Sequence, residues 1–221
     1  MQARLTGLNH NEALVYLGYR GGALPPDAAA DIARCEALLI KTVRPRAVWR
    51  RFALTPDGGF EGVSFRPEGG DVPRLLFGCE AVICFAATLG MEFEALMRRT
   101  QARSMAEAVV LDACGSAAIE NVCDNLCDDL AAAEAPLCLT DRFSPGYGDF
   151  PLTQQHAFCA MLDAQRRVGI TLSDSGLMTP QKSVTALLGV RRTPPEKRAR
   201  GCAYCGRFAN CTYRKDGITC G

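Results

Sequence analysis

The chain has 221 residues, of which 48% are hydrophobic and 22% charged, with a formal net charge of +1. This is the composition of a soluble globular protein with a substantial core, and the length fits one large domain with an appendage. No apolar run approaches the roughly 20 residues of a membrane-spanning helix, and the start lacks the pattern of a signal peptide. We therefore expect a cytoplasmic protein that engages neither membrane nor nucleic acid.

The first half of the chain is predicted to form two helices, a hairpin and a buried strand. Residues 12–19 and 27–43 have helical patterns, the second directly after a pair of prolines. Residues 47–54 and 60–67 are alternating runs on either side of TPDGG, a turn sequence, so they predict a hairpin. The nearly continuous apolar run at 80–90 predicts a buried strand.

The second half is predicted to open with a long helix. Ser104, followed three residues later by Glu107, forms a capping box, and the helix should run to about Ala135. A short helix and two strands are expected beyond it, at 154–162, 168–173 and 182–190. Helices and strands that cluster without strict alternation favour an α+β fold, with an antiparallel or mixed sheet, over a doubly wound one.

An acidic stripe runs along the predicted long helix. Four-residue spacing keeps neighbouring side chains on one face of a helix. This stripe is either the solvated face of an amphipathic helix or an acidic wall that binds a cationic ligand. Its members are Asp112, Ser116, Glu120, Asp124 and Asp128.

Small residues share the long helix with that stripe. Gly115 costs about 1 kcal/mol relative to alanine in a helix, which suggests that another part of the backbone approaches it closely. Cys114, Cys123 and Cys127 are expected to be packing residues, because no further Cys or His stands at a spacing that would complete a metal site with them.

Four segments together resemble a known family. They are EALVYLGYRG near the start, LDACGSAAIENVCD on the long helix, RFSPGYGDFPL at 142–152, and GITLSDSGLMTPQKSVTALLGV at 169–190. These residues resemble the activation domain, which binds S-adenosylmethionine, of cobalamin-dependent methionine synthase, and more closely its small stand-alone homologues. The resemblance covers roughly residues 8–190 and implies the fold of that domain.

The resemblance also implies a function in trans. In the family, the activation domain binds S-adenosylmethionine over the corrinoid while an electron donor reduces cob(II)alamin, and methyl transfer traps the reduced cobalt. A stand-alone chain is expected to serve a separate methionine synthase or another corrinoid protein. The alternative is a non-catalytic partner-binding module with a structural zinc tail. No nucleophile–base pair is implied, so we expect no catalytic residue in this chain.

The family's ligand contacts map onto the opening of RFSPGYGDFPL. Arg142 offers a bidentate fork for the ligand carboxylate, and Tyr147 offers an aromatic face that attracts a cationic sulfonium. Pro145 and Gly146 fix a turn whose backbone groups are exposed to the ligand. An acid on the preceding helix holds the ligand amine in the family. Its match here is Glu120, or Asp124 one turn later.

The last 31 residues differ in charge from the rest. Residues 1–190 carry 17 Lys and Arg against 22 Asp and Glu, whereas residues 191–221 carry 8 against 2. The change falls at RRTPPEKRARG, where paired prolines and a run of charges are typical of a linker. We therefore expect one domain at 1–190 and a basic, cysteine-rich tail at 191–221.

Four cysteines of the tail are candidate thiolate ligands of one metal centre. Four thiolates suit Zn²⁺ or an iron–sulfur cluster, and a segment this poor in apolar residues needs such a core to fold. A [4Fe–4S] cluster would give an electron route to cobalt, whereas zinc would be structural. Without a metal, the thiols would form disulfides or the tail would be disordered. The four are Cys202, Cys205, Cys211 and Cys220, spaced C-x2-C-x5-C-x8-C.

Overall fold

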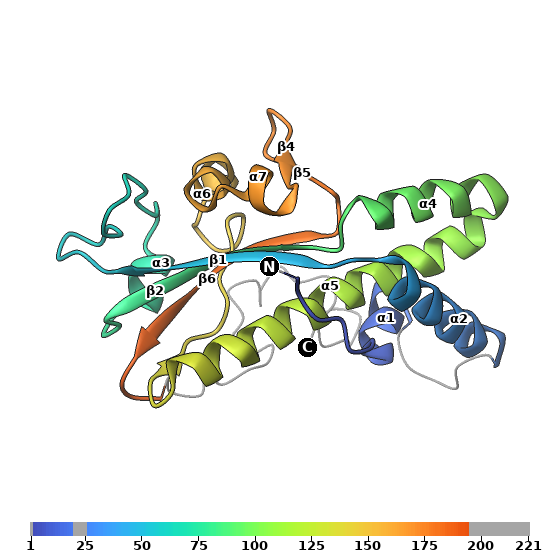
Figure 1. Ribbon diagram of the computed structural model, residues 1–221, viewed down its shortest axis with the longest axis horizontal. Coiled ribbons are helices and arrows are strands. Elements are labelled where there is room, and N and C mark those ends of the chain that lie inside the picture. The colour runs from blue at the N-terminus through green and yellow to red at the C-terminus, as the bar shows by residue number, and fades with distance from the viewer. Residues whose placement is uncertain (1, 20–25, 195–221) are drawn as a thin grey trace, which may run out of the picture.

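The computed structural model describes residues 2–19 and 26–194 and has three layers, with a sheet between two layers of helices (Figure 1). The main sheet is antiparallel, in the order β1-β2-β6-β3. A two-stranded ribbon stands apart from it. The strands of the main sheet are β1 (Arg46–Ala53), β2 (Ala81–Thr88), β3 (Cys138–Leu139) and β6 (Ser183–Arg191), and those of the ribbon are β4 (Thr171–Leu172) and β5 (Met178–Thr179).

Strand β2 lies between β1 and β6, and helices cover both faces of the sheet. All eight of its residues are buried, as the continuous apolar run predicted. Its alternate side chains enter two separate cores. Ile83 and Phe85 belong to the core under one helical layer, and Val82 and Cys84 to the core under the other.

The larger helical layer packs on one face of the sheet and contains the long helix. The side chain of Ser104 accepts a hydrogen bond from the backbone N–H of Glu107, so the predicted capping box forms the start of this helix. Cys114 and Cys123 are fully buried in the core below it, and Cys127 packs at its edge, as expected of packing residues. The helices of this layer are α1 (His10–Tyr16), α2 (Pro26–Thr42), α4 (Met91–Arg103) and α5 (Met105–Glu134).

The smaller helical layer covers the opposite face of the sheet with short elements. Four phenylalanines form a chain of ring contacts beneath it, from Phe52 through Phe60 and Phe65 to Phe158. The elements of this layer are α3 (Asp71–Leu75), the 3-10 turn η1 (Leu152–Gln154), α6 (Gln155–Leu162) and α7 (Ala164–Val168).

The predicted hairpin between residues 47–54 and 60–67 is wrong. Strand β1 pairs with β2 along its whole length instead, and only a single bridge, Leu54 to Phe60, joins the two predicted arms. Residues 60–67 form a loop instead, and its Phe60 and Phe65, five residues apart, are buried in the aromatic chain. The sequence patterns also failed to predict α3, α4, α7 and the short β3 and β5.

Gly115 on α5 is approached by side chains rather than by backbone. A Cβ at this position would clash with the ring of Phe93 on α4 and would lie 3.2 Å from Cε of Lys182. The expected close approach therefore exists, although the expected partner was wrong. This contact lets α4 and the start of β6 lie tightly against the middle of the long helix.

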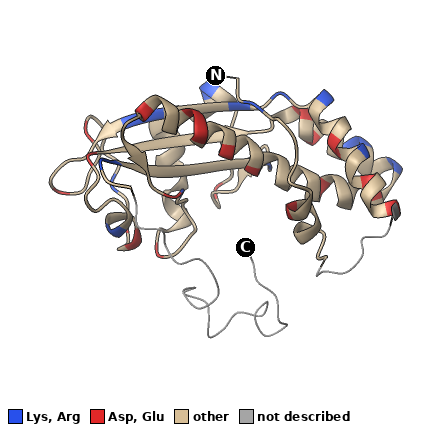
Figure 2. Ribbon diagram, turned by 90° about the horizontal axis from the view of Figure 1, so that it is seen from below, with Lys and Arg blue, Asp and Glu red and all other residues tan. Residues whose placement is uncertain are grey.

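Charged residues lie mainly on helices and loops, although strand β1 carries Arg46, Arg50 and Arg51 (Figure 2). No helix of the described residues is long and apolar enough to cross a lipid bilayer. Strand β6 ends at Arg191. The tail predicted beyond it, with Cys202, Cys205, Cys211 and Cys220, lies outside the described residues.

Candidate functional site

The RFSPGYG segment lies against the outer edge of β6. Phe143 exchanges two backbone hydrogen bonds with Leu187, at 3.0 and 2.9 Å. The segment then closes on itself, because the N–H of Gly146 donates to the carbonyl of Phe150 at 2.8 Å. Gly146 has φ +93°, a conformation that glycine adopts without strain. The rings of Phe143 and Phe150 stack at 6.3 Å, so the loop has its own small apolar core.

Asp149 fastens the end of this loop to the start of α3. Its carboxylate accepts hydrogen bonds from the backbone N–H groups of Gly70 at 2.7 Å and Asp71 at 3.0 Å. These two bonds lower the pKa of Asp149 below its ordinary value. The loop is thus held at both ends, by a strand and by a helix start, and it presents a preformed surface between them.

Arg142 connects the loop to the acidic stripe of α5. Its Nη2 atom lies 3.0 Å from the carboxylate of Glu120 and 2.9 Å from that of Asp124. The side chain is 27% exposed. Both predicted acids therefore meet the predicted arginine, and one guanidinium nitrogen serves two carboxylates one helical turn apart.

The rest of the Arg142 guanidinium lies in a less polar setting. Nη1 is buried and makes no well-formed hydrogen bond with a described residue. Burial by itself would lower the pKa of Arg142. At the high pH where a guanidinium titrates, Cys123 and Cys127 are thiolates, and they and the two carboxylates outweigh burial and raise this pKa. The same environment raises the pKa of Cys127 to about 11, with burial as the main cause. Arg142 therefore stays charged, and Cys127 stays a neutral thiol at physiological pH.

A cavity of about 830 Å³ opens beside Arg142. It wraps around the outer edge of β6, from α5 on one side of the sheet to α6 on the other. Tyr147 stands at its mouth and is 68% exposed. The wall consists of Glu120, Arg142, Phe143, Ser144, Pro145, Tyr147, Leu152, Gln155, Ser173, Gly176, Leu177, Met178, Thr179, Gln181, Ser183, Val184 and Thr185.

Four of the six predicted ligand residues line this cavity directly: Glu120, Arg142, Pro145 and Tyr147. The other two, Gly146 and Asp124, adjoin them, the first in the loop and the second through its ion pair with Arg142. The folded chain therefore brings all six predicted positions to one place. Two carboxylates, a guanidinium and a phenol there can bind a zwitterionic or cationic ligand.

Two residues of α1 that the sequence patterns did not single out lie at the same place. Burial first, and then the charges of Glu120 and Asp124, raise the pKa of Glu12 above its ordinary value, while Arg142 opposes them. Burial, Glu120 and Glu12 likewise raise the pKa of Tyr16. Nothing local in the sequence marks these two residues, because helix α1 meets α5 only through tertiary packing.

The amino-terminal half of the acidic stripe has a different partner. Lys182, just before β6, has its Nζ atom 2.9 Å from Asp112 and 2.8 Å from the hydroxyl of Ser116. These contacts are structural, because they join the start of β6 to α5. The two halves of the stripe thus do different things, and the half that lines the cavity is the one at Glu120.

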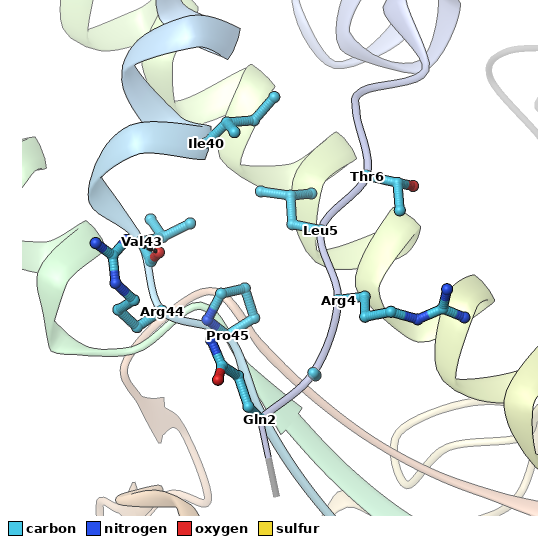
Figure 3. Close-up of a pocket in the computed structure, with 9 residues that line it drawn as sticks. Gln2, Arg4, Leu5, Thr6, Ile40, Val43, Arg44 and Pro45 are labelled. Atoms are coloured by element: carbon cyan, nitrogen blue, oxygen red, sulfur yellow. Dashed lines mark hydrogen bonds between the residues drawn. The ribbon is translucent and has the colours of Figure 1, made fainter.

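A second hollow of about 560 Å³ lies where the amino-terminal segment passes the end of α2 (Figure 3). The guanidinium groups of Arg4 and Arg44 point to opposite sides of it. Arg4 pairs with Asp129 at 2.5 Å, and Arg44 donates to the carbonyls of Lys41 and Val43. Because both cations are engaged in holding the chain, we assign no ligand to this hollow.

In residues 2–19 and 26–194, no cluster of three or more His, Cys, Asp or Glu side chains is arranged to hold a metal ion. The predicted ligands of the metal centre are in the tail, outside these ranges.

Comparison with solved structures identifies the fold. The chain superposes with a TM-score of 0.59 on the MetH reactivation domain, whose crystal structure contains bound AdoHcy. The superposition covers 99% of this chain and 85% of the other, at 16% sequence identity. No protein-family model matches the sequence, and the search of curated proteins finds no significant match. The chain thus has the α+β fold of the MetH reactivation domain, as the sequence resemblance implied.

Proposed function

We propose that this chain binds S-adenosylmethionine in the cavity beside Arg142 and supports reductive remethylation of cob(II)alamin on a separate protein. The partner is a methionine synthase or another corrinoid protein. The observation that carries the proposal is the meeting of Arg142, Glu120 and Asp124 at the mouth of a cavity that Tyr147 flanks. The shared fold with an AdoHcy-bound reactivation domain supports an adenosyl-type ligand.

The charges of the site suit this ligand. Glu12, Glu120 and Asp124 place three carboxylates around one guanidinium, an excess of negative charge that raises the pKa of Glu12 after burial. S-adenosylmethionine carries one carboxylate but two cationic groups, an ammonium and a sulfonium. Its carboxylate would bind Arg142 through charge-assisted hydrogen bonds, and its cations would offset the excess of acids. The face of Tyr147 adds attraction for the sulfonium.

The chemical step needs no nucleophile from this chain. A low-potential donor supplies one electron to cob(II)alamin, and the resulting cob(I)alamin attacks the methyl group of the bound ligand. The carbon–sulfur bond breaks, a carbon–cobalt bond forms, and the neutral thioether S-adenosylhomocysteine is left. The residues described here hold and orient the methyl donor, and the methyl transfer draws the unfavourable reduction forward.

A test in trans separates this function from simple electron transfer or docking. The full chain is mixed with a cob(II)alamin-loaded methionine synthase and a low-potential reductant, and methylcobalamin is followed by its absorption. Formation should accelerate only when both the chain and S-adenosylmethionine are present. Equal acceleration without the methyl donor would instead identify an electron carrier. No acceleration, combined with tight binding of the partner, would favour a docking module.

A further inference from the structure

The outer edge of β6 is paired at one end and open at the other. Leu187 pairs with Phe143 at this edge. The N–H of Gly189 donates to the hydroxyl of Thr140 at 2.8 Å, and its carbonyl accepts from the N–H of Thr140 at 2.9 Å. Successive residues of an antiparallel strand direct their backbone groups to opposite sides. Thr185 therefore directs its N–H and C=O to the same edge. Among the described residues no strand or bridge continues the pairing past Leu187, and Thr185 lines the cavity instead.

This opening is only one residue long. Two positions further, the N–H of Ser183 already donates to the carbonyl of Gln181 at 2.9 Å. An added peptide strand would need a longer run of free donors and acceptors. The single N–H and C=O of Thr185, which lines the cavity, instead fit the edge of a flat heterocycle.

A buried amide lies beside the open edge. Gln155 is 1% exposed and Thr185 is 2% exposed, and both line the cavity. Nε2 of Gln155 donates to the hydroxyl of Thr185 at 2.7 Å and otherwise faces the sulfur atoms of Cys159 and Met178. Its Oε1 atom accepts no hydrogen bond from a described residue. Because this oxygen is not among the fully buried unpaired side-chain atoms of the described residues, it stays accessible to solvent. A ligand donor that enters the cavity lined by Gln155 can therefore bind it.

We propose that the backbone of Thr185 and the amide of Gln155 recognise the 6-amino edge of the ligand's purine. Adenine presents the N6 amino donor beside ring-nitrogen acceptors, and a glutamine amide or a free strand edge complements this pattern. The inference rests on the proposed function and assigns the purine end of that ligand. The amino acid end then lies toward Arg142 and Glu120, at the other side of the same cavity.

This arrangement predicts selection against a 6-oxo purine. In hypoxanthine an acceptor oxygen replaces the N6 donor, and the neighbouring ring nitrogen becomes a donor. As a result, an acceptor of the ligand would face an acceptor of the site, and a donor would face a donor, beside the buried Gln155 and Thr185. Sites built to hydrogen-bond one polar group discriminate strongly against a ligand that lacks it, because their own buried groups stay unpaired. Thr185 and Gln155 thus select the purine, whereas Arg142 binds the amino acid part of the ligand.

Calorimetry on the full chain with S-adenosylmethionine and its 6-oxo analogue, S-inosylmethionine, tests the inference. The wild type should bind the 6-oxo analogue at least about tenfold more weakly. In Gln155→Leu this ratio should fall towards one, mainly through weaker binding of the adenosyl ligand. Gln154→Leu is the matched control, since Gln154 instead bonds to Arg66 and Glu68 outside the cavity, and its ratio should match the wild type.

The possible results test this inference separately from the proposed function on which it rests. Equal affinities of the wild type for both ligands, or an unchanged affinity ratio in Gln155→Leu, would refute recognition of the purine by Thr185 and Gln155. The assignment of S-adenosylmethionine as the ligand would remain. Binding of neither ligand would overturn the proposed function itself. If Gln155→Leu does not fold, Thr185→Val decides. It keeps the backbone edge but removes the hydroxyl that holds Gln155, so its ratio should drop below that of the wild type.

Discussion

Arg142 and Glu120 are separated by 22 residues in the sequence, yet Nη2 of the arginine lies 3.0 Å from the glutamate carboxylate. The contact joins the loop at the edge of the sheet to the long helix below it. Asp124, one turn further along the helix, shares the same nitrogen at 2.9 Å. This three-residue contact forms one wall of the proposed ligand site, so its residues are the first to be tested.

Arg142→Ala should weaken binding of S-adenosylmethionine by roughly 10- to 150-fold. Loss of one charge-assisted hydrogen bond typically costs about 1.5–3 kcal/mol, and the substitution also leaves Glu120 and Asp124 without their cation. Titration calorimetry measures the change. Arg66→Ala is the control, because Arg66 pairs with the exposed Asp57 away from the site, and its affinity should equal that of the wild type. Unchanged affinity in Arg142→Ala would contradict the ligand assignment.

Glu12→Gln should raise the melting temperature at neutral pH. Burial, and then Glu120 and Asp124, raise the pKa of Glu12 above its ordinary value of 4.5. An acid whose pKa is higher in the folded state loses stability as pH rises through that pKa, and the loss persists at neutral pH. The gain from the substitution should therefore be largest at pH 7 and disappear below about pH 4, near the unfolded pKa. Thermal unfolding across this range is the measurement.

Glu36→Gln should have the opposite effect and serves as the comparison. Although burial opposes it, the hydrogen bonds from His10 and from the N–H of Leu8 lower the pKa of Glu36. The stability it contributes is present above its unfolded pKa and is lost as pH falls through the folded pKa. The substitution should therefore destabilise at pH 7 and lose its effect in acid. The same sign for both variants would refute this account of the charges around α1.

Gly115→Ala should destabilise the fold despite the better helix propensity of alanine. The added methyl group would clash with the ring of Phe93. Overpacking of this kind typically costs about 1–3 kcal/mol, which exceeds or cancels the gain of about 1 kcal/mol in helix propensity. Urea unfolding gives the difference. In Gly7→Ala the new methyl would meet only the Glu36 carboxylate, at an ordinary 3.5 Å, so this control should lose less stability. A stabilised Gly115→Ala would show that α4 moves aside at little cost.

Cys205→Ser should abolish a metal centre in the tail, whereas Cys79→Ser should not. A four-thiolate site needs all of its ligands, and Cys79 instead lies half-buried in the folded body. Analysis of anaerobically purified protein for iron, zinc and sulfide measures the outcome. Iron with sulfide supports a [4Fe–4S] electron route, and zinc alone makes the tail structural. Neither metal in the wild type would refute a centre formed by Cys202, Cys205, Cys211 and Cys220.

The sequence by itself determined the elements that have strong local signals. The capping box at Ser104 predicted the start of α5 because that signal needs only a side chain and an N–H three residues apart. The continuous apolar run predicted β2 because both faces of that strand are buried. The RFSPGYG motif, through its family resemblance, singled out Arg142 and Tyr147 as ligand residues; both line one cavity, and their ligand role stays a prediction.

Only the tertiary structure decided which strands pair and which distant residues complete the site. Alternation in 60–67 predicted a strand, but the two buried side chains of this segment, Phe60 and Phe65, are five residues apart and fill a core from a loop. Glu12 and Gln155 carry no local signal of the roles proposed for them. They reach the site because α1 packs on α5 and because α6 lies beside β6. Such contacts depend on the packing of whole elements, which local residue patterns do not encode.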